Sequence, residues 1–367
     1  MKSERLFTMI SVVVLSCVVA SAQRITTFDA PGAGTGSGRG TFAQGINAFG
    51  IDWGYYVDGN GAAHGFLRLG SGGIVTFDVP GAGTQSGQGT FAYSLNPEGT
   101  VTGDYIDSSG VMHGYFRTFR GSITTFDAPG AGTGQGQGTF SININPTGTI
   151  AGYDYDSNDV AHAFIRHSDG TFTTYEAPGA GAGAGQGTGT AEDIGLNAEG
   201  FVTGAYIDSN NTLHAYVRAP DGTITGFDAP GAGTGPGQGT DVDGVNLTGV
   251  IPGVYFDSNS VIHGFVRAPD GTFTEFNVPG AGTGSNQGTV PQGLNTEGAL
   301  TGSYIDANNV FHGFLRDPSG TITTFDAPGA GSGGGQGTFP LLNNLEGAIT
   351  GYEVDSNGVA HGFVRTP

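Results

Sequence analysis

Short runs of alternating apolar and polar residues follow one another along this chain, separated by turns rich in glycine, proline and aspartate. Within one representative stretch, the runs span residues 90–95, 101–106, 112–118 and 123–127. Alternation with a period of two is typical of half-buried β-strands. The turns between the runs, such as Asn-Pro-Glu-Gly at 96–99, carry the proline and glycine that set tight-turn backbone angles. The pattern predicts four short antiparallel strands and no helix.

This four-strand unit is repeated along the chain. The motif TTFDAPGAG and its variants recur, and a histidine follows each copy in step. The aromatic residues of the motif are Phe28, Phe77, Phe126, Tyr175, Phe227, Phe276 and Phe325, and the histidines are His64, His113, His162, His214, His263, His312 and His361. Both series advance by 49 residues, except for one step of 52 where extra residues lie between Thr188 and Asn197. A fixed period of this length predicts units that bury their apolar faces against their neighbours.

The two ends of the repeat array indicate how it closes. Residues 24–29 match the fourth strand of a unit, with no first three strands before them. The chain ends at residues 365–367, just after a third strand. We therefore expect the N-terminal strand to complete the last unit, which removes the exposed edge of an open array. The predicted fold is all-β: a seven-bladed β-propeller of four-stranded antiparallel blades over residues 23–367.

The first 22 residues have the features of a secretory signal peptide. Lys2 and Arg5 precede an apolar core at 6–19, and the small residues Ala20-Ser21-Ala22 predict cleavage before Gln23. In the alternative interpretation, Cys17 lies in a lipoprotein box and carries a lipid anchor. We expect a secreted, extracellular or periplasmic protein.

Charge restricts the classes of partner. Without residues 1–22, the chain has no cysteine or lysine, and ten arginines face 31 acidic residues, a formal charge of −21. Phosphate binding needs clusters of lysine or arginine, so we expect no nucleic-acid partner. No later apolar run is long enough to span a bilayer. We expect no membrane insertion after signal removal, and a monomer.

Each unit carries the polar motif G-x-x-x-D-x-x-x-x-x-H-x-[FY]-x-R. Examples are Asp58, His64 and Arg68 in the first copy, Asp107, His113 and Arg117 in the second, and Asp257, His263 and Arg267 in the fifth. Because residues present in every copy favour a structural role, we expect the aspartate to accept hydrogen bonds from nearby backbone or from the histidine. We expect the arginine to form an ion pair with the acid that follows the fourth-strand aromatic. A ring of histidine metal sites and anion capture by the arginines are the alternatives.

A specific binding or catalytic site is expected where one copy differs from the others. Inner strands begin with Thr-Phe in several copies, whereas the fourth reads Thr190-Ala191-Glu192-Asp193 and the fifth reads Thr240-Asp241-Val242-Asp243. Carboxylates at a channel mouth can bind a hard cation or act as acid and base on a substrate. The candidate binding residues are Glu192, Asp193, Asp241 and Asp243. The alternative is that these acids are sequence drift without function, at a solvated rim of the channel. Trp53, with Tyr55 and Tyr56 beside it, could stack on a sugar or pack within its blade.

No cofactor, metal site or catalytic residue is predicted. Residues 154–158 begin like a calcium loop, but an EF-hand is excluded because Asp159 and Ile165 occupy the positions that need glycine and glutamate. A looser calcium turn remains open. No Ser-His-Asp or Cys-His arrangement lies outside the repeated frame.

The repeat N-x-x-G-x-[VIL]-x-G-x-Y-x-D-x-x-[GN]-x-x-H-[GA]-F, as in residues 295–314, resembles the extracellular repeats of the HAF family, with His162-Ala163-Phe164 as its literal form. The resemblance implies export and a repeat fold, and it brings no activity. We expect a non-catalytic binding or cell-surface interaction module for an extracellular glycan or protein. The alternatives are a lyase or hydrolase of extracellular polysaccharide and a purely structural envelope protein.

Overall fold

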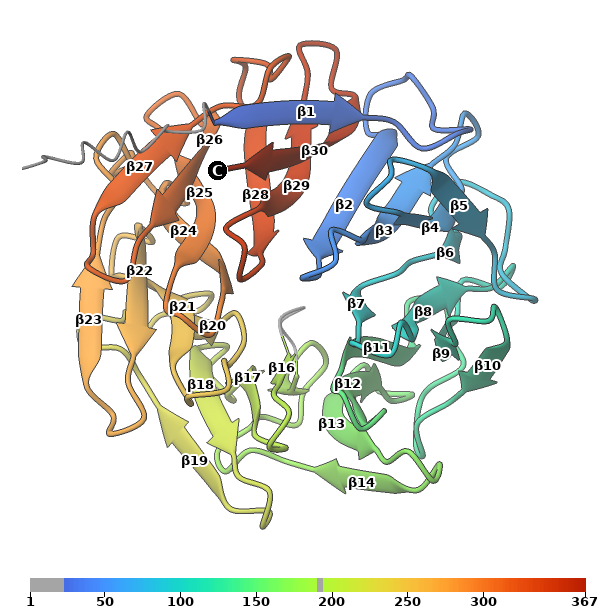
Figure 1. The fold of residues 1–367 in the computed structure, drawn as a ribbon. Helices are drawn as coiled ribbons and strands as arrows, with labels where there is room; N and C mark the ends of the chain where they lie inside the picture. The colour runs from blue at the N-terminus through green and yellow to red at the C-terminus, as the bar shows by residue number, and fades with distance from the viewer. Residues whose placement is uncertain (1–22, 190–193) are drawn as a thin grey trace, which may run out of the picture.

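The computed structural model describes residues 23–189 and 194–367, and within these ranges every regular element is a β-strand. The strands are arranged in a closed ring around a central channel (Figure 1). The predicted all-β class is therefore confirmed. The predicted signal peptide and the candidate residues Glu192 and Asp193 lie outside the described residues. The described part contains no helix that is long and apolar enough to cross a membrane.

Four series of strands succeed one another from the channel outward. The innermost strands are β2 (Gly40–Ile46), β6 (Gly89–Thr90) with β7 (Ser94–Leu95), β11 (Gly138–Ile144), β15 (Gly187–Thr188) with β16 (Gly195–Leu196), β20 (Gly239–Val242), β24 (Gly288–Leu294) and β28 (Gly337–Asn343). The second strands are β3 (Asp52–Val57), β8 (Val101–Ile106), β12 (Ile150–Tyr155), β17 (Val202–Ile207), β21 (Ile251–Phe256), β25 (Leu300–Ile305) and β29 (Ile349–Val354). The third strands are β4 (Ala63–Arg68), β9 (Met112–Arg117), β13 (Ala161–Arg166), β18 (Leu213–Arg218), β22 (Ile262–Arg267), β26 (Phe311–Arg316) and β30 (Ala360–Thr366). The outer strands are β5 (Ile74–Phe77), β10 (Ile123–Phe126), β14 (Phe172–Tyr175), β19 (Ile224–Phe227), β23 (Phe273–Phe276), β27 (Ile322–Phe325) and β1 (Arg24–Phe28). We number the repeat units 1 to 7 in chain order by their innermost strands.

Strands within a unit pair antiparallel, and neighbouring units are joined by a short parallel contact. In unit 1, β2 pairs with β3, β3 with β4, and β4 with β5. The parallel contact to unit 7 is formed by Gly40 opposite Ala360. Gly40 has φ +117°, and a Cβ there would lie 2.0 Å from the Ala360 carbonyl oxygen. Glycine at the start of the innermost strand is therefore required by the close approach of two units.

The N-terminal strand completes the last unit, as the chain ends predicted. β1 pairs antiparallel with β30, from Arg24 opposite Thr366 to Phe28 opposite Gly362. The side chain of Asp29, just past β1, contacts Nδ1 of His361 at 2.8 Å. Both backbone and side-chain contacts thus join residues from opposite ends of the sequence.

The glycine-rich links pack on the aspartate turns. In the link that precedes β2, the Gly34 amide donates to the Val57 carbonyl and the Gly38 amide donates to the Gly358 carbonyl, each at 2.8 Å. These acceptors flank the aspartate turns of units 1 and 7. The links and the aspartate turns therefore share one face of the ring.

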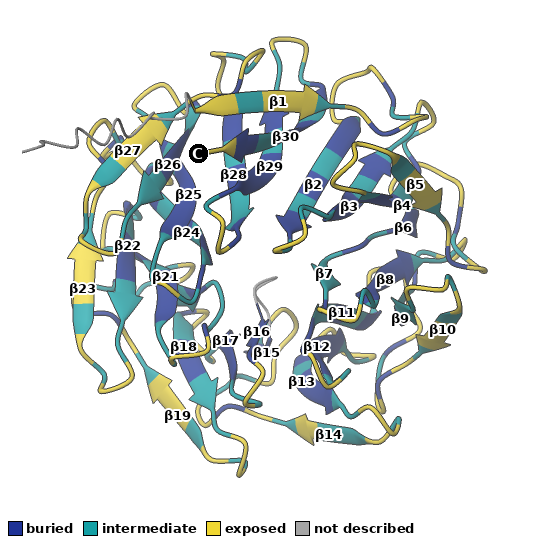
Figure 2. Cartoon of the chain, viewed as in Figure 1, coloured by how far each residue is buried: buried dark blue, intermediate teal, exposed yellow. Residues whose placement is uncertain are grey.

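The core lies between adjacent units, and every unit contributes the aromatic residue of its third strand to it. This ring is fully buried in each unit, as Phe66, Tyr115, Phe164, Tyr216, Phe265, Phe314 and Phe363. The outer strands contain no buried residue, and their positions are half-buried or exposed (Figure 2). Burying one such ring stabilises the fold by about 2 to 3 kcal/mol, so this single repeated position is a major source of stability.

Asparagine side chains link neighbouring units by hydrogen bonds at the turns that follow the innermost strands. The Nδ2 group of one asparagine donates to the main-chain carbonyl of its counterpart in the next unit, at 3.0 to 3.4 Å. The bonds run from Asn96 to Asn145, Asn145 to Asn197, Asn197 to Asn246, Asn246 to Asn295, Asn295 to Asn344, and Asn344 to Asn47. Our sequence analysis did not predict this network.

Candidate functional site

The repeated aspartate and histidine form a structural network, in agreement with the interpretation that these residues hold each unit together. In unit 1, Asp58 Oδ1 accepts hydrogen bonds from the backbone amides of Asn60 and Ala62 at 2.8 and 2.9 Å. Nδ1 of His64 lies 2.7 Å from Asp78 Oδ1, and its Nε2 lies 3.7 Å from Asp58 Oδ2. The imidazole therefore bridges two carboxylates on neighbouring turns.

The predicted ion pair between the repeated arginine and the acid after the fourth-strand aromatic is wrong. That acid pairs with the histidine instead, because the β4–β5 register places Gly65 opposite Phe77 and hence Asp78 beside His64. Arg68 lies four residues further along β4, about 13 Å at the rise of a β-strand.

The arginine stacks on the aromatic ring of the preceding unit's outer strand. The guanidinium carbon of Arg68 lies 4.7 Å from the centroid of Phe28. The other pairs are Arg117 on Phe77, Arg166 on Phe126, Arg218 on Tyr175, Arg267 on Phe227, Arg316 on Phe276 and Arg365 on Phe325. Cation–π contacts of this kind connect neighbouring units. Unit 1 also has an ion pair between Arg68 and the buried Asp52, at 2.7 Å.

Histidines and carboxylates are not grouped as metal ligands in the described structure. Within residues 23–189 and 194–367, no three or more His, Cys, Asp or Glu side chains are placed so as to hold a metal ion. At the turn considered for calcium, Asp156 Oδ1 accepts hydrogen bonds from the backbone amides of Asn158 and Val160. This carboxylate therefore shapes the turn.

The channel contains a cavity of about 590 Å³ with an aromatic wall on one side. We define the aromatic wall as the lining residues Tyr55, Phe91, Tyr93, Phe140, Tyr153 and Tyr352. All of these rings except the buried Tyr153 are only half-buried. They belong to units 7, 1, 2 and 3, so the wall extends over part of the ring only.

Ring contacts extend along this wall from unit to unit. Tyr55 contacts Phe91 edge-on at 4.9 Å, and Phe91 stacks on Tyr93 at 6.3 Å. In the other direction, Phe42 stacks on Tyr55 and meets Tyr352, both at 5.1 Å. Such contacts hold the rings in fixed orientations, so the wall presents preorganised flat apolar surfaces.

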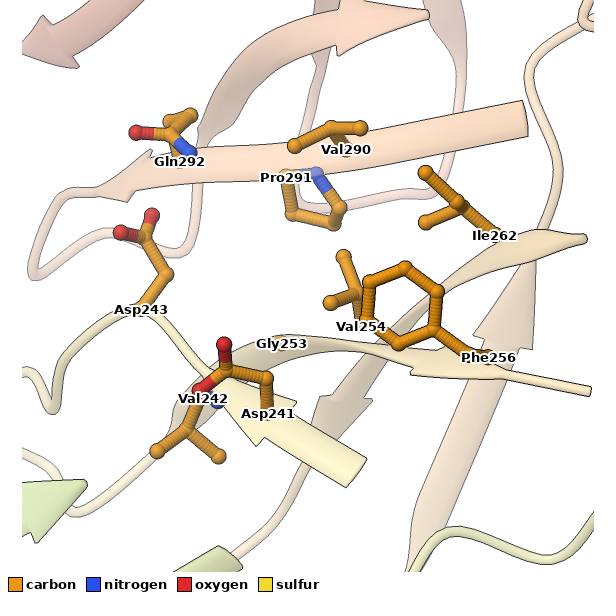
Figure 3. Close-up of a pocket in the computed structure, with 10 residues that line it drawn as sticks. All are labelled: Asp241, Val242, Asp243, Gly253, Val254, Phe256, Ile262, Val290, Pro291 and Gln292. Atoms are coloured by element: carbon orange, nitrogen blue, oxygen red, sulfur yellow. Dashed lines mark hydrogen bonds between the residues drawn. The ribbon is translucent and has the colours of Figure 1, made fainter. Parts of the chain in front are cut away.

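A side pocket opens between units 5 and 6, and two of the predicted site residues line it. The pocket has a volume of about 180 Å³, and Figure 3 shows Asp241, Asp243 and Gln292 toward one end and apolar side chains toward the other. The apolar lining comprises Val242, Val254, Phe256, Ile262, Val290 and Pro291. Asp243 and Gln292 also line the larger cavity, so the two spaces share these residues.

Burial changes the chemistry of one of these carboxyl groups. Asp241 has its pKa raised to about 6, because its burial disfavours the charged form, although a hydrogen bond from the Val242 amide partly opposes this effect. Asp241 therefore titrates close to neutral pH.

The remaining predicted site residues, Glu192 and Asp193, lie outside the described residues. Thr188, and not Thr190, is the counterpart of Thr41, because it accepts a hydrogen bond from the Ala177 amide as Thr41 does from the Ala30 amide. Gly189 is therefore the fourth-unit counterpart of Asp241. The alignment of Thr190-Ala191-Glu192-Asp193 with the fifth copy is wrong, because the insertion begins after the paired strand β15.

Trp53 belongs to the packing between units. It is 5% exposed, and its Nε1 donates a hydrogen bond to the Tyr93 carbonyl at 2.9 Å. Trp53 also lines the channel cavity, together with Tyr55, whose ring is half-buried. Tyr55, named with Trp53 in the sequence analysis as a ring that could stack on a sugar, belongs to the aromatic wall. The other rings of the wall were missed, although the Thr-Phe start of the inner strand recurs in units 1, 2, 3 and 7.

Comparison with known proteins shows similarity in fold. No protein-family model matches the chain, so the resemblance to HAF repeats stays a prediction. No curated protein matches it in sequence. The BP39L lectin from Burkholderia pseudomallei has a TM-score of 0.53 at 12% identity, with 89% of this chain and 98% of the lectin covered. A puromycin hydrolase in complex with PGG has a TM-score of 0.50 at 11% identity, with 87% of this chain and 50% of the hydrolase covered.

A third similar structure is the Aleuria aurantia lectin in complex with α-methyl-L-fucoside, with a TM-score of 0.44, 10% identity, and coverage of 83% of this chain and 94% of the lectin. This chain spans about half the length of the hydrolase and nearly the whole length of the first lectin. At these identities, the similarity shows a shared fold and nothing more.

Proposed function

We propose that this protein is a secreted, non-catalytic binding module that takes up an extracellular glycan in its central channel. In this proposal the ring is a seven-bladed β-propeller of four-stranded antiparallel blades, and its N-terminal strand completes the seventh blade. The repeat period, the strand pairings and the β1–β30 closure support the blade arrangement. Residues 1–22 would direct export.

The aromatic wall is the observation that carries this proposal. Half-buried rings such as Tyr55, Phe91 and Tyr352 leave apolar surface exposed in a concave cavity, where ligands commonly bind. The face of a pyranose ring presents C–H groups that pack on flat aromatic rings, and tyrosine hydroxyls can bond to sugar hydroxyls. The first lectin named above shows that a sugar-binding protein uses a similar fold.

A glycan array probed with the chain from Gln23 onward tests the proposal. Bound glycans would then be titrated calorimetrically against Tyr55→Ala and Tyr352→Leu, the latter of which keeps apolar bulk but removes the flat ring. We expect each variant to weaken binding about tenfold, or about 1.4 kcal/mol. Phe119→Ala is the matched control, because this ring is 71% exposed on an outer turn. Undiminished binding by both wall variants, with unfolding midpoints unchanged, would place the site elsewhere.

An enzyme acting on extracellular polysaccharide is the second candidate, and one observation favours it. The pKa of Asp241 is raised to about 6 by burial, beside a cavity large enough for sugars. A carboxyl group with such a pKa can serve as a general acid near neutral pH. Release of reducing or unsaturated sugar that is abolished by Asp241→Ala would support this function. Binding without any release would support the non-catalytic module.

A further inference from the structure

We propose that the channel selects glycans that carry free, protonated amino groups, with the amino group held by Asp243 at the mouth of the side pocket. This inference rests on the proposed glycan-binding function and adds to it the chemical class of the sugar. It follows from the position of Asp243 and Gln292, which line both the cavity with the aromatic wall and the side pocket.

The first step is the position of the carboxylate relative to the rings. Asp243 lines the same cavity as Tyr55, Phe91 and Tyr352. The rings belong to units 1, 2 and 7, whereas Asp243 follows β20 of unit 5, on another side of the channel in Figure 1. A sugar packed against the rings would therefore direct groups on its edge toward the side pocket.

The second step concerns charge. Among the described residues that line the cavity and the side pocket, none is basic, whereas Asp241 and Asp243 are both acidic. The formal charge of the whole chain is −20. A concave site with low-dielectric walls concentrates such a field, so the channel attracts cations and disfavours anionic sugars.

The third step concerns hydrogen bonding. An ammonium group donates three hydrogen bonds and accepts none, and carboxylate oxygens accept without donating. Asp243 and the amide oxygen of Gln292, which line both spaces, supply acceptors at the junction (Figure 3). A charge-assisted bond to Asp243 is stronger than a neutral one, so the amine is preferred over a hydroxyl or an acetamide.

The side pocket also has a feature that favours an N-acetyl group over a free amino group. Its far end is apolar, with Val254, Val290 and Pro291 in its lining, and the methyl of an N-acetyl group could occupy this space. An amino sugar and its N-acetylated form thus compete for the same place, and comparing them decides which feature of the pocket determines selectivity.

The test uses two trisaccharides that share one backbone: the β-1,4-linked trimer of glucosamine and its fully N-acetylated form. Both are titrated calorimetrically into the chain from Gln23 onward at a pH where the amines are protonated. We expect the amino trimer to bind about tenfold more tightly, in keeping with hydrogen bonds to charged groups. Asp243→Asn should remove most of this preference, because it weakens binding of the amino trimer. Raised salt should also reduce the preference.

Asp270→Asn is the matched control, because it removes the same charge from an exposed turn of the same unit. It should keep the tenfold preference, and thermal unfolding should show that both variants fold. Equal binding of the trimers, a preference for the acetylated form, or an equal loss in Asp270→Asn would overturn the inference. If neither trimer binds while other neutral glycans bind through the aromatic wall, the selectivity is wrong and the proposed function stands. If no glycan binds through the wall, the proposed function itself fails.

Discussion

The outer parts of the repeat units are nearly the same in every copy, whereas the channel wall differs from unit to unit. On the outside, the histidine–acid pair of His64 and Asp78 recurs from unit to unit, with Asn277 replacing the acid beside His263. In the channel, the position of Phe42 is taken by Asp241 in unit 5 and by Val290 in unit 6. The outer contacts recur with little change, whereas the divergent positions give the channel an asymmetric surface.

The second-strand residue opposite the repeated histidine also differs between units. In five units a tyrosine on the second strand stacks on the repeated histidine, as Tyr56 does on His64 with centroids 4.8 Å apart. Asp154 in unit 3 and Glu353 in unit 7 replace it, in the same register opposite the histidine. Both side chains are buried, and neither oxygen of Asp154 has a hydrogen-bond partner. A repeated frame thus tolerates a costly substitution in individual units.

The largest expected effect comes from removing the strand that closes the ring. Deletion of residues 23–28 removes β1, exposes the edge of β30 and uncovers Phe363 and Phe325, which pack with Ile25. We expect the free energy of unfolding to fall on the order of 4 kcal/mol, since two or more apolar side chains lose cover. Urea denaturation measures this loss. Arg24→Ala, which leaves the strand in place, is the control, and an unchanged midpoint in the deletion would contradict closure by this strand.

A stabilising substitution is expected in unit 3. Asp154→Tyr restores the ring present in most units, and space exists for it, because a Cβ at Gly130 meets no atom within 4 Å whereas a Cβ at the equivalent Gly32 meets Tyr56. Removing a buried, unpaired carboxyl group and filling this space should raise the free energy of unfolding by about 1 to 3 kcal/mol. The reciprocal Tyr56→Asp should lower it. A lower urea midpoint for Asp154→Tyr would show that unit 3 needs the acid.

The size of this gain should depend on pH. Burial raises the pKa of Asp154 from 3.8 to about 7, and that of Glu353 from 4.5 to about 7. A carboxyl group whose folded-state pKa is raised stabilises the fold below its unfolded pKa, and this contribution is lost as pH rises through the folded pKa. The stability difference between Asp154→Tyr and the parent should therefore be smallest near pH 4 and grow up to about pH 7. A difference that is constant over this range would contradict the buried-carboxyl interpretation.

The smallest effect distinguishes stacking from ion pairing at the repeated arginine. A double-mutant cycle between Arg117 and Phe77 should give a coupling of about 0.5 to 1 kcal/mol, because the guanidinium lies 4.9 Å from the ring centroid. The corresponding cycle between Arg117 and Asp127 should give no measurable coupling, because that acid contacts His113. Urea unfolding of the single and double variants provides both values. Coupling of Arg117 to Asp127 alone would contradict the cation–π contact and support the ion pair.

Much of the fold was predictable because it depends on local pattern and on the order of units. Alternation and turn residues predicted the strands, and the incomplete units at the two ends predicted the pairing of β1 with β30. The turn role of Asp58 also followed from sequence, because an aspartate accepts hydrogen bonds from the next few backbone amides whatever the rest of the fold does.

The tertiary structure alone decided the contacts between residues of different strands and units. The partner of Arg68 depends on the β4–β5 register and on Phe28 of β1, the outer strand of the adjacent unit 7. Similarly, Asp243 and Tyr55 line one cavity although they belong to units far apart in sequence. A sequence pattern specifies which residues share a strand face, but the neighbour across the channel is fixed only by how the ring closes, since closure sets the position and rotation of every unit relative to the others.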